Sequence, residues 1–260
     1  MTTAPSSTPH LFADWGRVAR LIGGKKRLLI FLDFDGTLVR IAAKPEAVRL
    51  DQQTRDILRK LAGHRNVKIV VISGRQRAEL QHFIGIPKIR YMGLYGWESN
   101  GSKKIPFPVR EALAHTLVSL QSALPAYPGV WIEAKRNSFS VHLLGTSRET
   151  QGQVRLRLKE QMKPLQKTLQ VMENLRDIEV APVAIGDKGM AVRKIIGEPA
   201  MRGALPVYFG DDFSDEPGFL AVRKGIPILV GKRRTTRAKY ALRGPAEVAA
   251  ALSRMEEAIQ

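Results

Sequence analysis

Short apolar runs alternate with amphipathic stretches along the first hundred residues. Runs at 28–33, 67–72 and 90–94 are rich in β-branched or aromatic residues and predict buried strands. Helix-like stretches at 51–62 and 75–83 separate them. Strands that alternate with helices in this way imply parallel βαβ units. This part of the chain therefore predicts an α/β domain with a parallel sheet.

The pattern changes after residue 98. Residues 100–108 (NGSKKIPFP) are rich in turn and breaker residues and indicate a boundary. The elements expected beyond it follow the order α-β-β-α-β-β, at 109–123, 130–135, 138–144, 148–162, 168–172 and 176–181. From about 184 the parallel pattern resumes, with a helix at 187–196, strands at 205–210 and 226–230, and a helix at 245–257. The order predicts a two-layer α+β module inserted into the parallel domain.

We therefore expect three parts in the chain. Residues 1–26 form a flexible or helical N-terminal segment, and within it residues 1–9 read as a short flexible tail. Residues 27–103 and 184–260 form the core domain, and residues 104–183 form the inserted domain. The fold class is α/β, with a Rossmann-like parallel-sheet core and an inserted α+β (αββαββ) domain.

Two carboxylates, Asp33 and Asp35, end the first predicted strand where Gly36 and Thr37 break it. Side chains two positions apart on a strand point the same way, so both acids should enter one pocket. Like charges at that range repel and raise one pKa unless a cation lies between them. The pair indicates a metal-assisted reaction with one nucleophile and one proton carrier. An Asp-rich turn is the structural alternative.

Three later segments carry compatible chemistry. Ser73 ends the second strand, where its hydroxyl and the following amides can hold a phosphate oxygen. Lys188 follows a predicted N-cap, Asp187, at a helix end whose dipole disfavours cations, which indicates an anionic ligand. The acids of PVYFGDDFSDE (206–216) call for a hard cation or many hydrogen bonds. Each segment also has a structural alternative: a plain turn at Ser73, a solvated lysine at Lys188 and an acid-rich helix start in 206–216.

Taken in order, these segments resemble the four motifs of the haloacid dehalogenase superfamily of phosphatases. The matching residues are DFDGTL at 33–38, Ser73, Lys188 and GDDFSDE at 210–216. Within that superfamily the chain looks most like the trehalose-6-phosphate phosphatases. The supporting residues are SGR at 73–75, GLYGWE at 93–98, Glu133, Lys135, His142, DKGMAV at 187–192 and VGKRRTTRAKYAL at 230–242. The resemblance covers nearly all of the chain from about residue 27.

The resemblance implies a Mg²⁺-dependent phosphomonoester hydrolase that works through an aspartyl phosphate and converts trehalose 6-phosphate to trehalose and phosphate. It makes the inserted domain a cap that excludes water and binds the leaving sugar. The site residues it implies are catalytic Asp33 and Asp35; phosphate-binding Ser73, Gly74 and Lys188; substrate-binding Arg75, Glu98, Glu133, Lys135 and His142; and the metal site of Asp33, Asp35, Asp211, Asp212 and Asp215. Arg75 and Glu98 can instead anchor a loop.

The chain departs from the family pattern at several positions. Tyr95 stands where the family usually has His, and Leu143 and Leu144 replace an aromatic–Arg pair. The stretch at 179–189 lacks an arginine common before its proline. These changes leave the phosphate chemistry intact and affect sugar recognition. A phosphatase for another sugar phosphate or for a glycosylated phosphoglycerate is therefore the alternative function.

In the cap, apolar and charged residues suggest different roles. Trp131, Phe139 and Val141 are expected in its core, as apolar residues at strand spacing usually are. Glu133 and Lys135 share one strand face, where sugar hydroxyls can meet an acceptor and a donor. They can instead pair with each other as an exposed salt bridge.

The chain is strongly basic, with 42 Lys and Arg against 24 Asp and Glu and a net charge of +18. One stretch concentrates several of them: Lys232, Arg233, Arg234, Arg237, Lys239 and Arg243. A non-catalytic polyanion-binding protein is thus a further alternative. A solvated surface is the simpler explanation. Few aromatic residues that could stack on bases lie near this stretch, and Tyr240 is the obvious one. We therefore expect no nucleic-acid partner.

Composition sets the remaining expectations. The chain has no cysteine, which excludes disulfides and thiolate metal sites. No apolar run reaches the roughly 20 residues that span a bilayer. We expect a cytoplasmic enzyme with a small sugar-phosphate substrate and no membrane partner.

Overall fold

The computed structural model describes residues 8–42, 45–99, 104–135, 137–143, 145–173, 177–233 and 235–259. Leu144 and Arg234, singled out in the sequence, and residues 1–7 of the expected tail lie outside these ranges. The chain divides into two compact units. The core unit comprises Met1–Asn100 and Asp187–Gln260, and the inserted unit comprises Gly101–Gly186.

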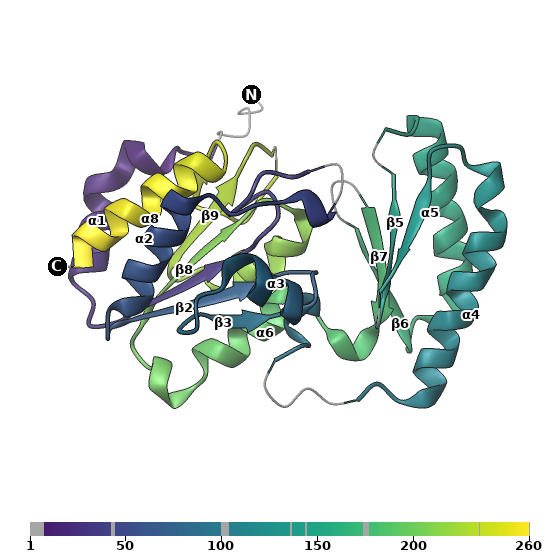
Figure 1. Ribbon diagram of the computed structural model, residues 1–260, viewed down its shortest axis with the longest axis horizontal. Coiled ribbons are helices and arrows are strands. Elements are labelled where there is room, and N and C mark those ends of the chain that lie inside the picture. The colour runs from purple at the N-terminus through teal and green to yellow at the C-terminus, as the bar shows by residue number, and fades with distance from the viewer. Residues whose placement is uncertain are drawn as a thin grey trace, which may run out of the picture. The chain divides into compact units, whose positions relative to one another are not determined.

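The core unit is built on a parallel sheet of the order β10-β9-β8-β1-β2-β3 (Figure 1). Its strands are β1 (Leu28–Leu32), β2 (Val67–Ile72), β3 (Arg90–Met92), β8 (Leu205–Gly210), β9 (Ile226–Val230) and β10 (Tyr240–Leu242). Strands β1 and β9 are buried at every position. A strand covered on both faces reads as a continuous apolar run, which is how the sequence identified it.

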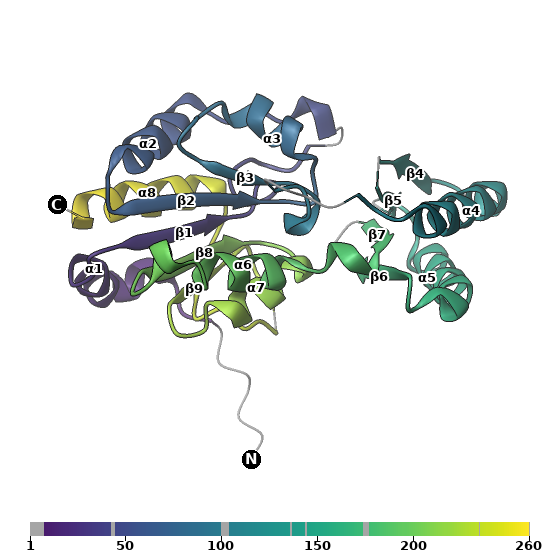
Figure 2. The ribbon, with the colours of Figure 1, turned by 90° about the horizontal axis from the view of Figure 1, so that it is seen from below.

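Helices cover both faces of this sheet (Figure 2). They are α1 (Trp15–Gly23), α2 (Gln52–Gly63), α3 (Arg77–Ile84), α6 (Lys188–Ile196), α7 (Glu216–Ala221) and α8 (Pro245–Ile259). Helices α1, α2, α3 and α8 share one apolar cluster with the sheet, and α6 and α7 share the other. The short 3-10 helices lie at Leu11–Asp14, Pro45–Ala47, Leu94–Gly96, Leu124–Ala126, Lys163–Leu165, Val183–Ile185, Pro199–Met201 and Phe213–Asp215.

The inserted unit has the expected αββαββ order. Its elements are α4 (Phe107–Ala123), β4 (Trp131–Ala134), β5 (Phe139–His142), α5 (Arg148–Met162), β6 (Leu169–Glu173) and β7 (Asp177–Pro182). The strands form an antiparallel sheet in the order β4-β5-β7-β6. Helices α4 and α5 pack on one face of that sheet and share an apolar cluster with it (Figure 2). The predicted fold class is confirmed.

One expected member of the inserted unit's core is wrong. Phe139 and Val141 are buried as expected, but the Trp131 side chain is 45% exposed. The register places Trp131 opposite His142, not opposite Val141. Trp131 therefore lies on the polar face of the sheet, away from α4 and α5. Spacing along one strand groups its own residues by face, but it does not say which face a neighbouring strand shares.

The N-terminal segment is integrated into the core unit. Leu11 is fully buried, and Val18 and Ile22 of α1 join the same apolar cluster. The Tyr240 hydroxyl donates to Asp14 at 2.8 Å. Within the described residues, no helix is both long and apolar enough to cross a membrane.

We predict that the N-terminal segment contributes measurably to stability. Leu11→Ala should lower the free energy of unfolding by about 2–4 kcal/mol, because it opens a cavity in a packed core. Leu21→Ala, on the exposed side of α1, is the matched control and should change it by less than about 0.5 kcal/mol. Urea unfolding followed by circular dichroism measures both. Equal effects of the two substitutions would contradict the prediction.

Candidate active site

Acidic residues from two distant parts of the chain meet at the carboxyl ends of β1 and β8. These strands are parallel neighbours, with Leu32 opposite Phe209. The Asp33 amide continues the pairing by donating to the Phe209 carbonyl oxygen at 2.9 Å. The turns that start at Asp33 and Asp211 are therefore adjacent. Carboxylate oxygens of Asp33, Asp211 and Asp215 lie within 4.8 Å of one another.

The turn after β1 leaves room for the Asp211 side chain. Gly36 has a φ of +81°, in the left-handed region that favours glycine. A Cβ atom on Gly36 would lie 2.1 Å from Asp211 Oδ2, so a larger residue would displace this carboxylate. Thr37 holds the carboxylate by donating from Oγ1 to Asp211 Oδ1 at 3.3 Å.

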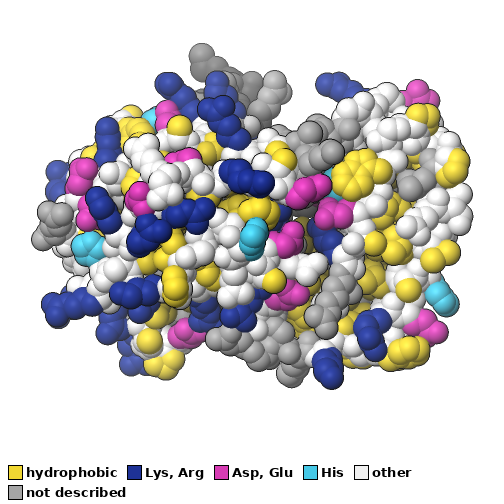
Figure 3. All heavy atoms as spheres, viewed as in Figure 1, with side chains coloured by type: hydrophobic (Ala, Val, Ile, Leu, Met, Phe, Trp, Pro, Cys, Tyr) yellow, Lys and Arg dark blue, Asp and Glu magenta, His cyan; other side chains and the backbone are white. Residues whose placement is uncertain are grey.

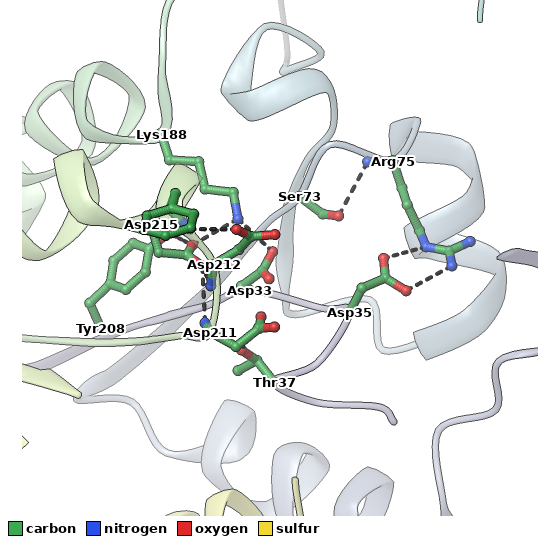
Figure 4. Close-up of polar contacts among 11 residues, drawn as sticks. Asp33, Asp35, Thr37, Ser73, Arg75, Lys188, Tyr208, Asp211, Asp212 and Asp215 are labelled. Atoms are coloured by element: carbon green, nitrogen blue, oxygen red, sulfur yellow. Dashed lines mark hydrogen bonds and ion pairs between the residues drawn. The ribbon is translucent and has the colours of Figure 1, made fainter. Parts of the chain in front are cut away.

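Lys188 supplies the positive charge of this cluster (Figure 4). It begins α6, and the predicted N-cap is confirmed because the Asp187 side chain accepts from the Met190 amide. The Lys188 ammonium is buried and donates to Asp33 Oδ1 and Asp215 Oδ1, each at 2.7 Å. The helix dipole disfavours a cation at this end. The position of Lys188 is explained by two carboxylates of the chain itself. The sequence argument had explained it by an anionic ligand.

Asp215 accepts four hydrogen bonds. Besides Lys188, the Tyr208 hydroxyl donates to its Oδ1 at 2.8 Å. The amides of Asp211 and Asp212 donate to its Oδ2 at 3.0 and 2.9 Å. Burial, with the Asp215 carboxylate next in effect, raises the pKa of Tyr208 well above its usual range, so the tyrosine stays a donor. Through these four contacts the buried Asp215 carboxylate orients Lys188 and the turn. Its oxygens also belong to the acidic group of Asp33, Asp211 and Asp215 that could hold a metal ion.

Asp35 pairs with Arg75. Arg75 Nε and Nη2 donate to Asp35 Oδ2 and Oδ1 at 2.6 and 2.8 Å, a bidentate arrangement (Figure 4). The guanidinium also lies over the rings of Phe34 and Phe83, 5.5 and 5.2 Å from their centroids. The sequence argument put Asp33 and Asp35 around one shared cation. In the structure each acid has its own cationic side chain.

Ser73 and Gly74 form the turn after β2. The Ser73 hydroxyl oxygen accepts from the Arg75 amide at 3.2 Å. A Cβ atom on Gly74 would lie 2.9 Å from the Tyr95 hydroxyl oxygen, so the tyrosine packs directly against this turn. The Tyr95 backbone has a φ of 58°, which is uncommon outside glycine, and its amide donates to the Ser73 carbonyl oxygen at 2.9 Å. Tyr95 therefore supports the turn from within the fold.

Glu98 anchors the neighbouring loop. Its carboxylate accepts from the Arg77 amide at 2.7 Å, at the start of α3. Gly93 and Glu98 form a backbone bridge that closes the loop between them. Two roles were considered for Glu98, substrate contact and loop anchoring. These contacts are those of a loop anchor.

The other acids of the 210–216 segment stabilise its loop. The Asp212 side chain accepts from the Phe213 amide. Glu216 accepts from the Arg237 amide at 2.8 Å and lies 3.4 Å from Arg233 Nη2. The Arg233 side chain is 8% exposed and lies over the Phe213 ring, 4.9 Å from its centroid. Part of the basic stretch therefore holds the acidic loop in place.

Other basic side chains are dispersed. Figure 3 shows Lys and Arg scattered over the visible face of the core unit among acidic and apolar side chains. Lys239 donates to the Gly225 carbonyl oxygen at 3.1 Å, and Arg243 Nε lies 3.6 Å from Glu247. This distribution supports the solvated-surface explanation of the net charge over a polyanion-binding stripe.

The inserted unit has its own polar cluster, on the face of its sheet opposite the helices. Lys135 donates to Glu179 Oε2 and to Ser140 Oγ, both at 2.8 Å, and Ser140 donates to the same carboxylate. Burial works against the ammonium charge, yet the Glu179 carboxylate raises the pKa of Lys135 above its usual value. Lys135 thus pairs with Glu179, in place of the exposed pair with Glu133 that was the alternative.

Comparison with known proteins identifies the family to which this chain belongs. The sequence model of the trehalose-phosphatase family matches residues 31–246. The trehalose-phosphate phosphatase of Mycobacterium bovis (strain BCG / Pasteur 1173P2) is 32% identical over 268 residues, covering 96% of this chain and 65% of that protein. The chain belongs to the trehalose-phosphatase family. It spans less than two thirds of the length of this mycobacterial relative.

Solved structures share the fold of this family member. The C-terminal domain of Candida albicans trehalose-6-phosphate phosphatase matches with a TM-score of 0.80 at 21% identity, covering 97% of this chain and 99% of that one. A haloacid dehalogenase-like hydrolase from Bacteroides thetaiotaomicron matches with a TM-score of 0.60 at 15% identity, covering 88% and 100%. The predicted resemblance to the trehalose phosphatases is confirmed by the family match, and the solved structures show the shared fold.

Sequence reasoning missed several residues of these two polar clusters. Tyr208 lies inside an apolar run, two residues before Gly210, and its polar tip in a buried strand was the available signal. Glu179 is an acid flanked by the apolar residues Ile178 and Val180 in a strand, a pattern that predicts a buried partner. Thr37 carried no signal beyond its place in the turn.

The carboxylates of this family member outnumber the cations beside them. In their ionised forms Asp33, Asp211 and Asp215 would carry three negative charges, and among the described residues Lys188 is the cation hydrogen-bonded to Asp33 and Asp215. Burial, opposed by Lys188, raises the pKa of Asp33 to about 7. Burial, together with the Asp33 charge, raises the pKa of Asp211 well above its usual range. Carboxylate oxygens are the ligands of hard divalent cations, so Asp33 and Asp211 fit such an ion.

We predict that Asp211→Asn stabilises the protein when divalent cations are removed with a chelator. The amide keeps an acceptor for Thr37 and removes one buried charge. Because the folded pKa of Asp211 is raised, the wild type loses stability as pH rises above the ordinary carboxyl value of about 3.9. The gain of the variant should therefore grow from pH 5 to pH 8, with about 2–4 °C in Tm for each kcal/mol.

Differential scanning fluorimetry with and without Mg²⁺ measures this effect. Mg²⁺ should raise the Tm of the wild type more than that of the variant. Asp56→Asn, an exposed acid on α2, is the matched control and should leave the response to Mg²⁺ unchanged. A metal-free Tm that is lower in Asp211→Asn than in the wild type at pH 8 would contradict the electrostatic argument.

Proposed function

We propose that this chain hydrolyses trehalose 6-phosphate to trehalose and phosphate through an aspartyl-phosphate intermediate. The observation that carries the proposal is the meeting of Asp33, Lys188, Asp211 and Asp215 at the carboxyl ends of β1 and β8 in a member of the trehalose-phosphatase family. Brought together, these groups form a nucleophile, a fixed cation and a set of hard oxygen ligands in one place.

In the first step Asp33 acts as the nucleophile. Lys188 occupies Oδ1 of Asp33, which fixes the carboxylate and leaves Oδ2 to attack phosphorus. A bond forms between Oδ2 and phosphorus while the bond from phosphorus to the sugar oxygen breaks. The Asp35 carboxyl group transfers its proton to that departing oxygen.

The phosphoryl oxygens need donors as charge develops on them. Lys188 uses two of its three N–H donors on Asp33 and Asp215, so the third can serve a phosphate oxygen. The Ser73 hydroxyl and the Gly74 amide follow β2, the strand next to β1, and supply further donors. These three residues form the proposed phosphate site.

Asp33, Asp211 and the backbone carbonyl of Asp35 would hold a Mg²⁺ ion. When bound, the ion neutralises the repulsion between the attacking carboxylate and the phosphate dianion. Asp215 supports this set through Lys188 and the 211–212 amides, and Asp212 supports it through the loop that it caps.

In the second step the Asp35 carboxylate takes a proton from water, and the water oxygen attacks phosphorus. The bond between phosphorus and Asp33 Oδ2 breaks, releasing phosphate and restoring the enzyme. In the structure both Asp35 oxygens accept from Arg75, which holds Asp35 as the carboxylate that takes this proton. When Asp35 carries the proton for the first step, one of the two contacts is released to free that oxygen. Arg75 is thus a positioning residue in this proposal.

The inserted unit is proposed as the cap domain that binds the sugar. Glu133, Lys135 and His142 share its polar face with Glu179, and together they offer donors and acceptors for hydroxyl groups. The family departure at Leu143 does not fall on this face, because Leu143 is buried in the apolar cluster of the inserted unit. This favours trehalose 6-phosphate over another sugar phosphate.

We predict phosphate release from trehalose 6-phosphate that exceeds release from sucrose 6-phosphate, glucose 6-phosphate and a glucosyl phosphoglycerate. A malachite-green assay with Mg²⁺ or with a chelator tests the substrate and the cation together. Asp33→Asn should lower kcat by at least about 10³-fold, because the nucleophile is lost. A circular dichroism spectrum like that of the wild type is the control for folding.

The two parts of the proposal fail separately in this assay. Turnover of a different sugar phosphate alone would overturn the substrate assignment and keep the mechanism. Wild-type phosphate release by Asp33→Asn would overturn the nucleophile assignment. Retention of nucleic acid without any Mg²⁺-dependent hydrolysis would support the polyanion-binding alternative.

We predict that Arg75→Lys lowers kcat for trehalose 6-phosphate by about 10–100-fold with a smaller change in KM. Lysine keeps the charge but loses the two-pronged contact that orients Asp35. General acid catalysis contributes about 10²–10⁴-fold, and misorientation should lose part of it. With 4-nitrophenyl phosphate, whose leaving group departs without a proton, the loss should be several times smaller. Equal losses on both substrates would argue against positioning of the acid.

A further inference from the structure

Trp131 differs from the other exposed apolar side chains of the inserted unit. Phe107 and Val118 are exposed on α4, and Leu156 on α5 lines a hollow with the exposed Val171 of β6, on the helix side of the sheet. Trp131 lies on β4, an edge strand, and its indole is stacked on the His142 imidazole. The ring centroids are 3.7 Å apart and the planes differ by 7°. One face of the indole is thus covered by His142, and 45% of the residue remains exposed.

The indole is held in one orientation by its neighbours. Trp131 and His142 are directly opposite in the β4–β5 register. His142 Nε2 lies 3.0 Å from Glu133 Oε2, so the imidazole is fixed at its far end. Among the described residues, none accepts a hydrogen bond from the Trp131 indole, which leaves its N–H available to a ligand. The strand pairing and the stack on His142 together support one orientation of this flat apolar surface.

Polar groups lie along the same face of the sheet. Beyond the His142–Glu133 pair come Ser140, Lys135 and Glu179, linked by hydrogen bonds. The Glu179 side chain is buried and that of Lys135 is 15% exposed, and Glu179 Oε1 has no hydrogen-bond partner among the described residues. A buried carboxylate oxygen without a donor is costly, so a donor from a ligand would stabilise it. Hydroxyl groups are donors of this kind.

A flat aromatic surface bordered by carboxylates and an ammonium matches one class of ligand. A pyranose ring has C–H groups on its faces, which pack on an aromatic plate, and hydroxyls around its rim, which need donors and acceptors. Small-molecule sites combine apolar walls with a few fixed polar groups in this way. An anionic group would gain nothing from the face of the indole, and a purely apolar ligand would leave the polar rim unpaired.

We propose that Trp131, held by the His142–Glu133 pair, stacks on a pyranose ring of the leaving sugar and thereby determines specificity for hexose-containing phosphomonoesters. This inference rests on the proposed function and extends it to a residue that the sequence analysis assigned to the core. Stacking binds the sugar without touching the phosphate, so it affects hexose esters and not esters of small alcohols.

Kinetics on two substrates test the role of Trp131. Trp131→Ala should lower kcat/KM for trehalose 6-phosphate at least about tenfold, and Trp131→Phe should retain most of it. For glycerol 2-phosphate, which has no ring, kcat/KM should stay within about twofold of the wild type in both variants. Val118→Ala, an exposed apolar residue on α4, is the matched control and should leave both substrates unaffected.

A binding measurement separates this inference from the proposed function. Trehalose, which carries no phosphate, should change the tryptophan emission of the wild type, and the change should be absent in Trp131→Phe. If the wild type releases no phosphate from trehalose 6-phosphate, the proposed function fails, and the emission test still decides the role of Trp131. Unchanged kcat/KM of Trp131→Ala on the hexose ester, or an identical emission change in Trp131→Phe, would overturn the inference.

Discussion

The contact of the Lys188 ammonium with Asp33 and Asp215 joins three elements of the core unit. It links the first turn of α6 to the acid that ends β1 and to the loop that follows β8. Buried carboxylates at this density are unstable without a partner cation, so the contact is a condition for the turns to lie where they do. The same contact leaves one Asp33 oxygen unoccupied by lysine, which makes structural support and reactivity two results of one interaction.

Most of the architecture could be predicted from local patterns. Buried strands such as β1 and β2 are short apolar runs, and the helix at 188–196 carries an N-cap that can be read directly. The inserted αββαββ order followed from breaker residues and alternation. What could not be predicted depends on partners distant in sequence. Helix α1 packs on α8 from the other end of the chain, and β10 is too short to stand out.

For the site, too, the sequence predicted some features and not others. Motif order located Asp33, Ser73, Lys188 and Asp211, because each lies at the end of a strand or the start of a helix and a parallel sheet brings those ends to one edge. Side-chain pairing was beyond the sequence. Nothing in the spacing says that Asp35 turns to Arg75, that Lys135 chooses Glu179 over Glu133, or that Trp131 faces away from the helices. These outcomes depend on strand register and on tertiary packing.

The separate partners of Asp33 and Asp35 have an evolutionary consequence. Lys188 governs the acid that would become phosphorylated, and Arg75 governs the acid that would shuttle the proton. Under the proposed mechanism, mutations near Arg75 would alter proton transfer to the leaving group and leave the pair of Asp33 and Lys188 in place. Because the two pairs are separate, such a site could evolve to release a different alcohol while keeping the proposed nucleophile and its lysine partner.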